Sequence, residues 1–336
     1  MSVSGVYVQS NEGDGNRVFV FRRGDDGQLS DPVIVSSGGR GDDVPHLTSQ
    51  GSVVLASDGR LLVTNAGSGD ISVLAIAAEP KVVAVVSSGG PAPKSIAERD
   101  GLVYVLNTGD RSLVGFRLTK AELVEVSGSR RELEAGADPA QVGFTPDGTK
   151  VVVTDRGANA VLVYPVGADG LLGEPNATPS AGPTPYGFTF ARDDTLVVTE
   201  AFGAAKGKAA ASSYRVGTGG VEVVTSSVGN GRSEICWAVP SADGRYVFTT
   251  NFADGAVSCY RVSSGGELVL DNAAAAVTFD GVPGLRDEDI TGDGRFLYAI
   301  DAVGGRVFGW RVDEGALTPL GFWNGLPTTV AGLAAN

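Results

Sequence analysis

The stretch that decides the fold is Phe144-Thr-Pro-Asp-Gly-Thr-Lys-Val-Val-Val-Thr-Asp155, followed by Ala160-Val-Leu-Val-Tyr164. Asp147-Gly148 supplies the positive-φ positions of a tight hairpin, and both apolar runs have the β-branched composition of buried strands. Asp155 ends the first run, where an Asx side chain favours a turn by hydrogen-bonding to the nearby backbone. The stretch therefore predicts a hairpin, a strand, a turn and a second strand.

The same pattern recurs along the whole chain. An apolar run ends in an aromatic residue or leucine at intervals of 42 to 53 residues, the period of a propeller blade, at Phe21, Leu74, Phe116, Tyr164, Tyr214, Tyr260 and Trp310. A turn signal precedes six of these runs, at Asp58, Asp100, Asp147, Asp193, Asp243 and Asp293. An Asn or acidic residue closes the intervening strand, at Asn65, Asn107, Asp155, Glu200, Asn251 and Asp301.

Seven markers predict an all-β, seven-bladed propeller with four antiparallel strands per blade, formed as a single domain by residues 1–336. The first blade has only three strands near the N-terminus, at Gly5–Gln9, Arg17–Arg22 and Gln28–Val35. The small-residue segment 326–336 has the composition of the missing innermost strand. We expect it to complete blade one, formed by residues 1–40 plus 326–336, because ring closure removes open sheet edges.

Charge and scarce residues exclude several function classes. The chain has 26 Lys and Arg against 39 Asp and Glu, a net charge of −13, so we expect no nucleic-acid or membrane partner. A single histidine, His46, excludes multi-histidine metal sites, and we expect no cofactor. The start of the chain has no export signal, which predicts a cytoplasmic protein. A small-molecule ligand is the expected partner, and a protein partner stays open.

The stretch 144–155 and Leu61-Leu-Val-Thr-Asn-Ala-Gly-Ser68 resemble the blade phrasing of lactonase-type seven-bladed propellers. This family includes bacterial 6-phosphogluconolactonase and fungal carboxymuconate-lactonizing enzymes, so the resemblance implies a lactone as ligand. In the family, blade five reads Gly-Pro-Arg-His and then has a strand ending in Asn-Glu, with the Arg, His and Glu at the site. Here Glu200 carries over, whereas Thr184 and Pro185 stand in place of the arginine and histidine.

Propeller geometry separates two rims. The Asp-Gly hairpins form one, which we call the hairpin rim; the segments entering each innermost strand and the turns after each second strand form the other, which we call the entry rim. Function is expected at the entry rim, where a polar funnel over the central channel would hold a ligand. The predicted substrate-binding residues are Lys94, Gln141, Asp155, Lys206, Lys208, Glu234, Trp237, Asn251, Arg286, Asp287 and Asp301.

Four residues are predicted to be catalytic. Glu200 stands where the other blades have Asn or Asp, and its side chain is too long for an Asx turn. A residue that does not fit the local turn indicates a functional carboxylate. It precedes a loop enlarged by about five residues within 201–210, a small-residue flap whose Lys206 and Lys208 would favour an anion. His46 is the only side chain whose ordinary pKa suits a base at neutral pH. Glu288 and Tyr186 complete the set.

The segment 284–290 is the densest charge cluster. Strand alternation would place Arg286, Glu288 and Ile290 on one side. Three interpretations stay open: ion pairs Glu288–Lys94 or Arg286–Glu234 across the channel; substrate binding or acid/base work; and a Ca²⁺ ion held by Glu234, Glu288 or Asp301. Cys236 and Cys259 are expected to be free, because they fall two strands apart in one blade.

Two functions follow from these residues. The first is binding of a small anionic or hydroxylated cyclic ester, with hydrolysis or isomerisation as the chemistry. Glu200, or Glu288 with Tyr186, would activate water, while Lys94, Arg286 and the two flap lysines would hold the carbonyl or carboxylate. The second is a non-catalytic propeller that binds a small ligand or a protein and has lost the catalytic Arg and His. A Ca²⁺-dependent lactonase site is the third.

Overall fold

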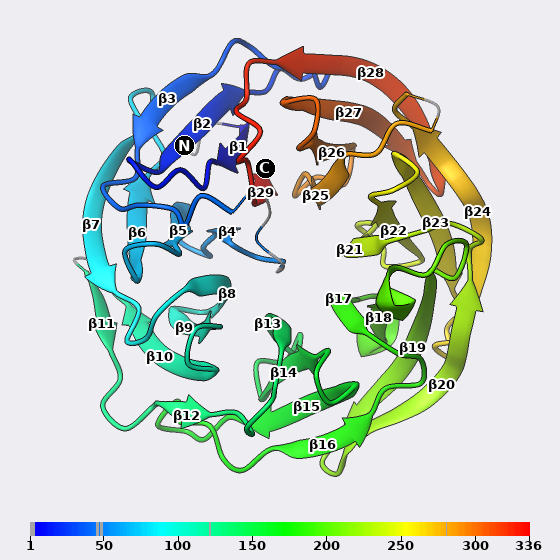
Figure 1. Ribbon diagram of the computed structural model, residues 1–336, viewed down its shortest axis with the longest axis horizontal. Helices are drawn as coiled ribbons and strands as arrows, with labels where there is room; N and C mark the ends of the chain where they lie inside the picture. The colour runs from blue at the N-terminus through cyan, green and yellow to red at the C-terminus, as the bar shows by residue number, and fades with distance from the viewer. Residues whose placement is uncertain (1–3, 45–46, 48–49, 121, 280) are drawn as a thin grey trace.

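The computed structural model describes residues 4–44, 47, 50–120, 122–279 and 281–336. Seven antiparallel sheets stand as blades around a central channel (Figure 1). Each blade has a path of four strands, and blade three carries a short fifth strand that pairs with its third. The predicted seven-bladed β-propeller is thus confirmed.

The strands run outward from the channel in each blade. In the first four blades they are β29 (Leu333–Ala335), β1 (Gly5–Gln9), β2 (Arg17–Arg22) and β3 (Val33–Ser36); β4 (Val53–Leu55), β5 (Arg60–Asn65), β6 (Asp70–Ala75) and β7 (Lys81–Ser87); β8 (Pro93–Arg99), β9 (Leu102–Asn107), β10 (Ser112–Leu118) and β11 (Leu123–Glu125) with β12 (Arg131–Glu132); β13 (Pro139–Phe144), β14 (Lys150–Asp155), β15 (Ala160–Pro165) and β16 (Asn176–Pro179).

The last three blades follow the same order. They are β17 (Pro185–Phe190), β18 (Leu196–Glu200), β19 (Ala210–Gly217) and β20 (Gly220–Gly229); β21 (Ile235–Pro240), β22 (Tyr246–Asn251), β23 (Ala256–Val262) and β24 (Leu268–Val277); β25 (Leu285–Ile290), β26 (Phe296–Asp301), β27 (Arg306–Asp313) and β28 (Ala316–Asn324). Two 3-10 turns, η1 (Arg192–Asp194) and η2 (Phe202–Ala204), lie in blade five. No helix in the described ranges is long and apolar enough to cross a membrane.

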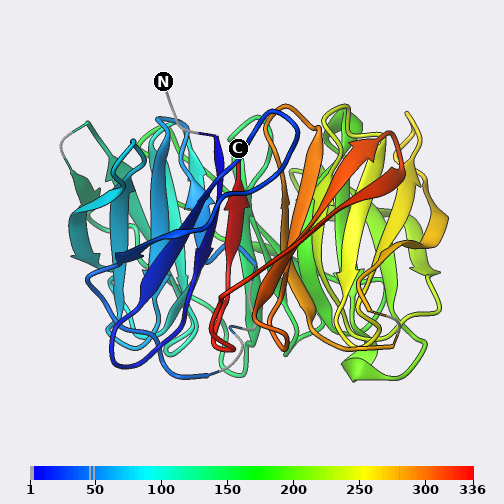
Figure 2. The ribbon, with the colours of Figure 1, turned by 90° about the horizontal axis from the view of Figure 1, so that it is seen from above.

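The C-terminal strand closes the ring, as predicted. β29 pairs with β1 through Val6 opposite Ala335 and Val8 opposite Leu333, and Figure 2 shows it standing between the first and last blades. The side chain of Asn336 accepts a hydrogen bond from the Gly5 amide at 2.7 Å. The strand is shorter than the predicted segment, because only residues 333–335 reach β1.

The blades pack through the buried side chains of their second and third strands, the aromatic markers among them. Second and third strands are covered on both faces by neighbouring blades, so their side chains are buried almost throughout. Each outermost strand has one exposed face, and β7 alternates accordingly. Tyrosines of the second strands also join neighbouring blades, since the Tyr298 hydroxyl donates to the Gly27 carbonyl at 2.6 Å and that of Tyr104 to Gly170 at 2.7 Å.

The hairpin rim has the predicted turn chemistry. Gly148 has φ +69°, and the Asp147 carboxylate accepts hydrogen bonds from the Thr145 hydroxyl at 2.6 Å and the Thr149 amide at 3.0 Å. Those bonds hold the pKa of Asp147 at about 2. Blade five lacks the glycine and uses Asp194 at φ +55° instead, which Asp tolerates better than most residues.

Candidate functional site

A pocket of about 270 Å³ lies at the entry rim between blades four and seven. We call it the entry-rim pocket. Its walls come from the start of the innermost strands and the turns after second strands, as propeller geometry predicts. The lining residues are Arg156, Thr184, Tyr186, Ala201, Gly203, Ala204, Glu234, Ile235, Cys236, Phe252 and Arg286.

Irregular backbone shapes this pocket. The innermost strands β17, β21 and β25 all lose register with their partners near the entry rim, between Pro185 and Phe188, Ile235 and Ala238, and Leu285 and Glu288. Such bulges re-aim side chains that regular alternation would place elsewhere. Thr184 and Glu234 also have positive φ, at +60° and +54°. Strained non-glycine backbone of this kind concentrates at functional sites.

Two arginines are held against aromatic rings in the pocket. The guanidinium of Arg156 lies 5.0 Å from the ring centre of Tyr186 and pairs with Asp138 at 2.6 Å. The guanidinium of Arg286 lies 4.3 Å from the ring centre of Phe252. Stacking restricts both side chains, so the two guanidinium groups are held in place in the lining of the pocket.

The titratable groups of the pocket differ in what they can do. Burial raises the pKa of Tyr186 far above its ordinary value, against the lowering effect of Arg156 and Arg286. Burial also raises the pKa of the Cys236 thiol to about 12. Both groups are therefore protonated at neutral pH. Glu234 supplies the pocket's carboxylate, and its backbone carbonyl accepts a hydrogen bond from the Cys236 thiol at 3.4 Å.

Glu200 has a different place from the one predicted. It is fully buried behind the rim and is not part of the lining. Its carboxylate accepts hydrogen bonds from the Gly182 amide at 2.8 Å and from the hydroxyls of Ser212 and Ser227 at 2.5 and 2.7 Å. Glu200 does not bond its own turn, as expected of glutamate, but satisfies three donors elsewhere in blade five.

The enlarged loop after Glu200 does border the pocket. Ala201, Gly203 and Ala204 line it, and the Thr184 hydroxyl accepts a hydrogen bond from the Gly203 amide at 3.0 Å. Lys206 and Lys208 are exposed and lie outside the lining. The flap therefore contributes a wall of small residues, while the pocket's positive charge comes from arginines.

Three predicted ligand-binding residues instead hold their own turns. Asp155 accepts hydrogen bonds from the amides of Asp138 at 2.8 Å and Gly157 at 2.9 Å. Asn251 donates to Ala256 and Ser258 at 3.1 and 2.9 Å. Asp301 pairs with Arg306 at 3.0 Å. All three are buried, none lines the entry-rim pocket, and their contacts are those of turn chemistry.

Other predicted residues are scattered. The Gln141 amide donates to the Phe188 carbonyl at 3.0 Å and accepts from the Phe188 amide at 2.6 Å, so it ties blade four to blade five. Lys94 pairs with Asp42 at 3.7 Å. His46 lies outside the described residues. Of the predicted residues, the structure brings together Tyr186, Glu234 and Arg286 in the entry-rim pocket.

The charged segment of β25 divides between two cavities. Arg286 faces the entry-rim pocket, whereas Asp287, Glu288 and Ile290 line a second cavity of about 340 Å³ along the channel. Regular alternation, which grouped Arg286 with Glu288 and Ile290, is wrong because of the bulge. The predicted Glu288–Lys94 ion pair is wrong, because Lys94 pairs with Asp42. Arg286 and Glu234 both line the entry-rim pocket, and an ion pair between them stays a prediction.

The residues expected around a Ca²⁺ ion do not meet. Glu234 lies in the entry-rim pocket, Glu288 in the channel and Asp301 beside Arg306. Within the described part of the chain, no group of three or more His, Cys, Asp or Glu side chains is placed to hold a metal ion. Cys236 and Cys259 are both free and buried, as predicted.

Sequence reasoning missed Arg156. It directly follows the turn residue Asp155, at the entry rim of blade four. The signal available was its position one residue beyond a second-strand end. Only the packing of the blades around the channel brings this turn of blade four against Tyr186 of blade five and into one pocket with Arg286 of blade seven.

Known structures share the fold along the whole chain. A proposed 6-phosphogluconolactonase from Bacteroides fragilis has a TM-score of 0.77 at 16% identity, covering 98% of this chain and 97% of that chain. A Lactobacillus plantarum protein has a TM-score of 0.76 at 15% identity, covering 99% of both chains. The periplasmic gluconolactonase PpgL of Pseudomonas aeruginosa has a TM-score of 0.73 at 17% identity, also covering 99% of both.

Comparison of the sequence with protein families and with curated proteins gives one match, to part of the chain. No curated protein matches the chain significantly. Residues 115–201, which run from blade three into blade five, match the sequence model of the family described as lactonase, 7-bladed beta-propeller. The resemblance of this chain to the lactonase-type seven-bladed propellers is thereby confirmed, by that match and by the fold shared over its full length.

Proposed function

We propose that the entry-rim pocket binds a small anionic cyclic ester and hydrolyses it. The observation that carries the proposal is the joint presence of Arg156, Arg286 and Glu234 around one cavity of about 270 Å³. Two oriented guanidinium groups suit a carboxylate, a phosphate or a polarised ester carbonyl. The remaining walls, from Phe252, Ile235 and the small flap residues, suit the ring of the ligand.

In this proposal Glu234 is the general base. It accepts a proton from a water molecule, whose oxygen forms a bond to the ester carbonyl carbon. One arginine stabilises the negative charge that develops on the carbonyl oxygen. The ring C–O bond then breaks, the ring oxygen takes up the proton, and a hydroxy acid results. Tyr186 is protonated at neutral pH, so its part is that of a hydrogen-bond donor.

These assignments revise the earlier expectation on two points. Glu234 replaces Glu200 and Glu288 as the water-activating group, because it faces the pocket that holds the arginines. Arg156 joins Arg286 in place of Lys94 and the flap lysines. A hydrolase role also agrees with the names of the similar structures, a proposed 6-phosphogluconolactonase and a gluconolactonase.

A non-catalytic binding propeller is the second candidate. It is favoured by the neutral state of the pocket's thiol and phenol, which leaves Glu234 as the single described base. The substitution of Thr184 and Pro185 for the family's Arg and His points the same way. In that case the same pocket would bind the anionic ligand without turnover.

The test follows acid release at neutral pH from sugar, aryl and muconate-type lactones, with and without EDTA. Turnover is expected, with Glu234→Gln lowering kcat by about 100-fold or more, the range of general-base catalysis. Arg286→Met should raise KM by about 10-fold or more, since a charge-assisted hydrogen bond contributes roughly 1.5–3 kcal/mol. Arg261→Met, at an exposed arginine outside this pocket, is the matched control.

Two other results would decide against hydrolysis. If calorimetry shows that the native chain binds a lactone, but neither the native chain nor any of the three variants releases acid, the protein is a binding propeller without turnover. Equal rates for the native chain and Glu234→Gln would remove Glu234 as the base.

A further inference from the structure

The wall of the entry-rim pocket is mainly apolar. Ile235, Cys236 and Phe252 contribute to it from blade six, and the flap adds the methyl groups of Ala201 and Ala204. The Cys236 side chain counts with the apolar groups, because its thiol is protonated at neutral pH. A wall of this composition favours a ligand with an apolar ring, since contact removes the apolar surface of both from water.

The polar backbone atoms of this wall are bonded to one another. The Ala201 amide donates to the Thr184 carbonyl at 3.0 Å. The Phe252 amide and the Cys236 thiol both donate to the Glu234 carbonyl, at 2.9 and 3.4 Å. A sugar lactone carries several hydroxyl groups, and each one that leaves water without a new partner weakens binding. The two arginines and the Glu234 carboxylate are already used by the proposed reaction, so the pocket suits a ring without hydroxyl groups.

Two planar guanidinium groups lie on aromatic rings in this wall. Arg286 lies 4.3 Å from the ring centre of Phe252, and Arg156 lies 5.0 Å from that of Tyr186. Guanidinium groups and aromatic rings both present flat faces, and another aromatic ring stacks on such faces. The flat groups therefore favour an aromatic ring in the ligand over a puckered aliphatic one.

The charges of the pocket suit a ligand with one negative charge. Arg156 is paired with Asp138 at 2.6 Å, and Arg286 shares the lining with the carboxylate of Glu234. The phenol and the thiol of the pocket are protonated at neutral pH. Two arginines are thus accompanied by two carboxylates, so little positive charge is left over for a phosphate ester, which carries about −1.5 to −2 at pH 7. A single carboxylate needs less and matches the planar guanidinium group.

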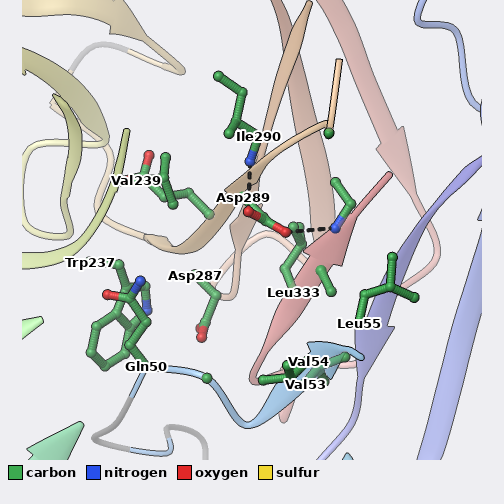
Figure 3. A pocket seen from close by; sticks show the side chains of 15 residues that line it. Gln50, Val53, Val54, Leu55, Trp237, Val239, Asp287, Asp289, Ile290 and Leu333 are labelled. Atoms are coloured by element: carbon green, nitrogen blue, oxygen red, sulfur yellow. Dashed lines mark hydrogen bonds between the residues drawn. The ribbon is translucent and has the colours of Figure 1, made fainter. Parts of the chain in front are cut away.

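The second cavity, which we call the channel cavity, does not suit an anion. It lies between β4, β21, β25 and β29, and its described lining contains Asp287, Glu288 and Asp289 but neither lysine nor arginine. Asp289 accepts hydrogen bonds from the amides of Ile290 and Ala335, both at 2.8 Å (Figure 3). The ligand is therefore expected to fit within the entry-rim pocket, whose volume of about 270 Å³ lies near the lower end of the range for small-molecule sites.

We infer that the ligand of the entry-rim pocket is an aromatic lactone with a single carboxylate, in which the lactone ring is fused to a benzene ring. This inference rests on the proposed function and narrows its substrate class. The benzene ring packs on Phe252, Ile235 and the flap, and the carboxylate pairs with an arginine. Sugar lactones and phosphorylated lactones are excluded by the lack of partners for their hydroxyl groups and of surplus positive charge.

The experiment is titration calorimetry of the full chain with two lactams that differ only in the fused benzene ring. They are 1-oxoisoindoline-5-carboxylate and 5-oxopyrrolidine-3-carboxylate, and each has one carboxylate. Lactams replace lactones because their amide bond resists hydrolysis, so binding is measured apart from turnover. Gluconate and 6-phosphogluconate represent the sugar acids. We expect the aromatic lactam to bind about 10-fold or more tightly than the plain lactam and than gluconate, because the additional ring buries apolar surface.

The outcomes separate this inference from the proposed hydrolysis. Binding of the aromatic lactam with the expected preference, but no acid release from the corresponding lactone, 5-carboxyphthalide, would support the ligand class and refute the hydrolysis. Turnover of sugar lactones, with gluconate or 6-phosphogluconate bound as tightly as the aromatic lactam, would do the reverse. Absence of binding by the aromatic lactam would also overturn the inference.

Phe252→Leu locates the benzene ring, since it keeps an apolar side chain and removes an aromatic face. Its affinity for the aromatic lactam should fall about 5-fold or more, and its affinity for the plain lactam should change less. Phe279→Leu is the matched control, because Phe279 also lies under an arginine, with Arg306 at 4.9 Å, but lines neither cavity. An unchanged preference in a folded Phe252→Leu chain would refute the placement of the ring. If that variant does not fold, the comparison of the four probes on the native chain decides.

Discussion

The ring of Tyr186 stacks on the indole of Trp237, with centroids 4.9 Å apart and planes inclined by 22°. Tyr186 lines the entry-rim pocket and Trp237 lines the channel cavity. The stacked pair is therefore a wall between the two cavities. Adjacent residues of two strands repeat this division, because Cys236 and Arg286 face the rim while Trp237 and Asp287 face the channel.

Truncation of that wall is expected to cost stability and merge the cavities. Trp237 is fully buried, so Trp237→Ala should lower the free energy of unfolding by about 3–5 kcal/mol, as for other large-to-small core changes. Urea unfolding measures the loss. Trp323→Ala, at a half-buried outer-strand tryptophan, is the control and should cost clearly less. A loss below about 1 kcal/mol for Trp237→Ala would contradict the assignment of Trp237 as a wall residue.

Glu200 is predicted to act on stability rather than on chemistry. Glu200→Ala leaves the Gly182 amide and the hydroxyls of Ser212 and Ser227 without their acceptor. An unsatisfied buried polar group costs about 1–3 kcal/mol, so unfolding should become easier by at least that amount. The folded fraction should keep its kcat for whichever lactone is turned over. A normal melt with abolished kcat would instead restore the catalytic role.

Stability is predicted to fall as pH rises from about 4 to 7. Burial is the main cause that raises the pKa of Asp287 to about 6, that of Asp289 to about 7 and that of Glu288 well above its ordinary value. The native chain therefore holds protons that the unfolded chain has lost above pH 4, and each group lowers stability by up to about 1.4 kcal/mol per pH unit until its native pKa is passed.

The measurement compares urea unfolding of the native chain and Glu288→Gln at pH 4.5, 5.5, 6.5 and 7.5. The stability of the native chain relative to the variant should decrease steadily across this range. Asp147 and Asp243, whose pKa values are lowered to about 2, act in both proteins and only below pH 4. A constant difference between the two proteins would show that Glu288 ionises normally.

Ring closure is predicted to be essential. Deletion of 326–336 removes β29 and exposes the edge of β1 as well as the apolar faces of Val6 and Val8. The truncated chain should lose its cooperative thermal transition, as circular dichroism can follow. A synthetic peptide of residues 326–336 should restore the transition when added in excess. A truncated chain that melts cooperatively on its own would contradict this prediction.

Much of the fold could be predicted because its signals are local. The valine runs, the Asp-Gly turns and the aromatic markers each act within about ten residues, and the observed β1 and β2 coincide with the predicted segments 5–9 and 17–22. Irregular edges were less predictable. β3 begins at Val33 instead of residue 28, because Leu29 makes only an isolated bridge to Arg23.

The sequence by itself determined the seven-bladed ring, its closure and the rim that carries the entry-rim pocket, because strand alternation and turn chemistry are properties of neighbouring residues. The tertiary structure alone decided the roles of the acids. Glu200, Glu234 and Glu288 are the same residue type on the same kind of blade. Yet Glu200 is held by three hydrogen-bond donors, Glu234 lines a pocket with two arginines, and Glu288 is buried beside two other acids. Those differences arise from bulges and from contacts between blades, and chain neighbours do not encode them.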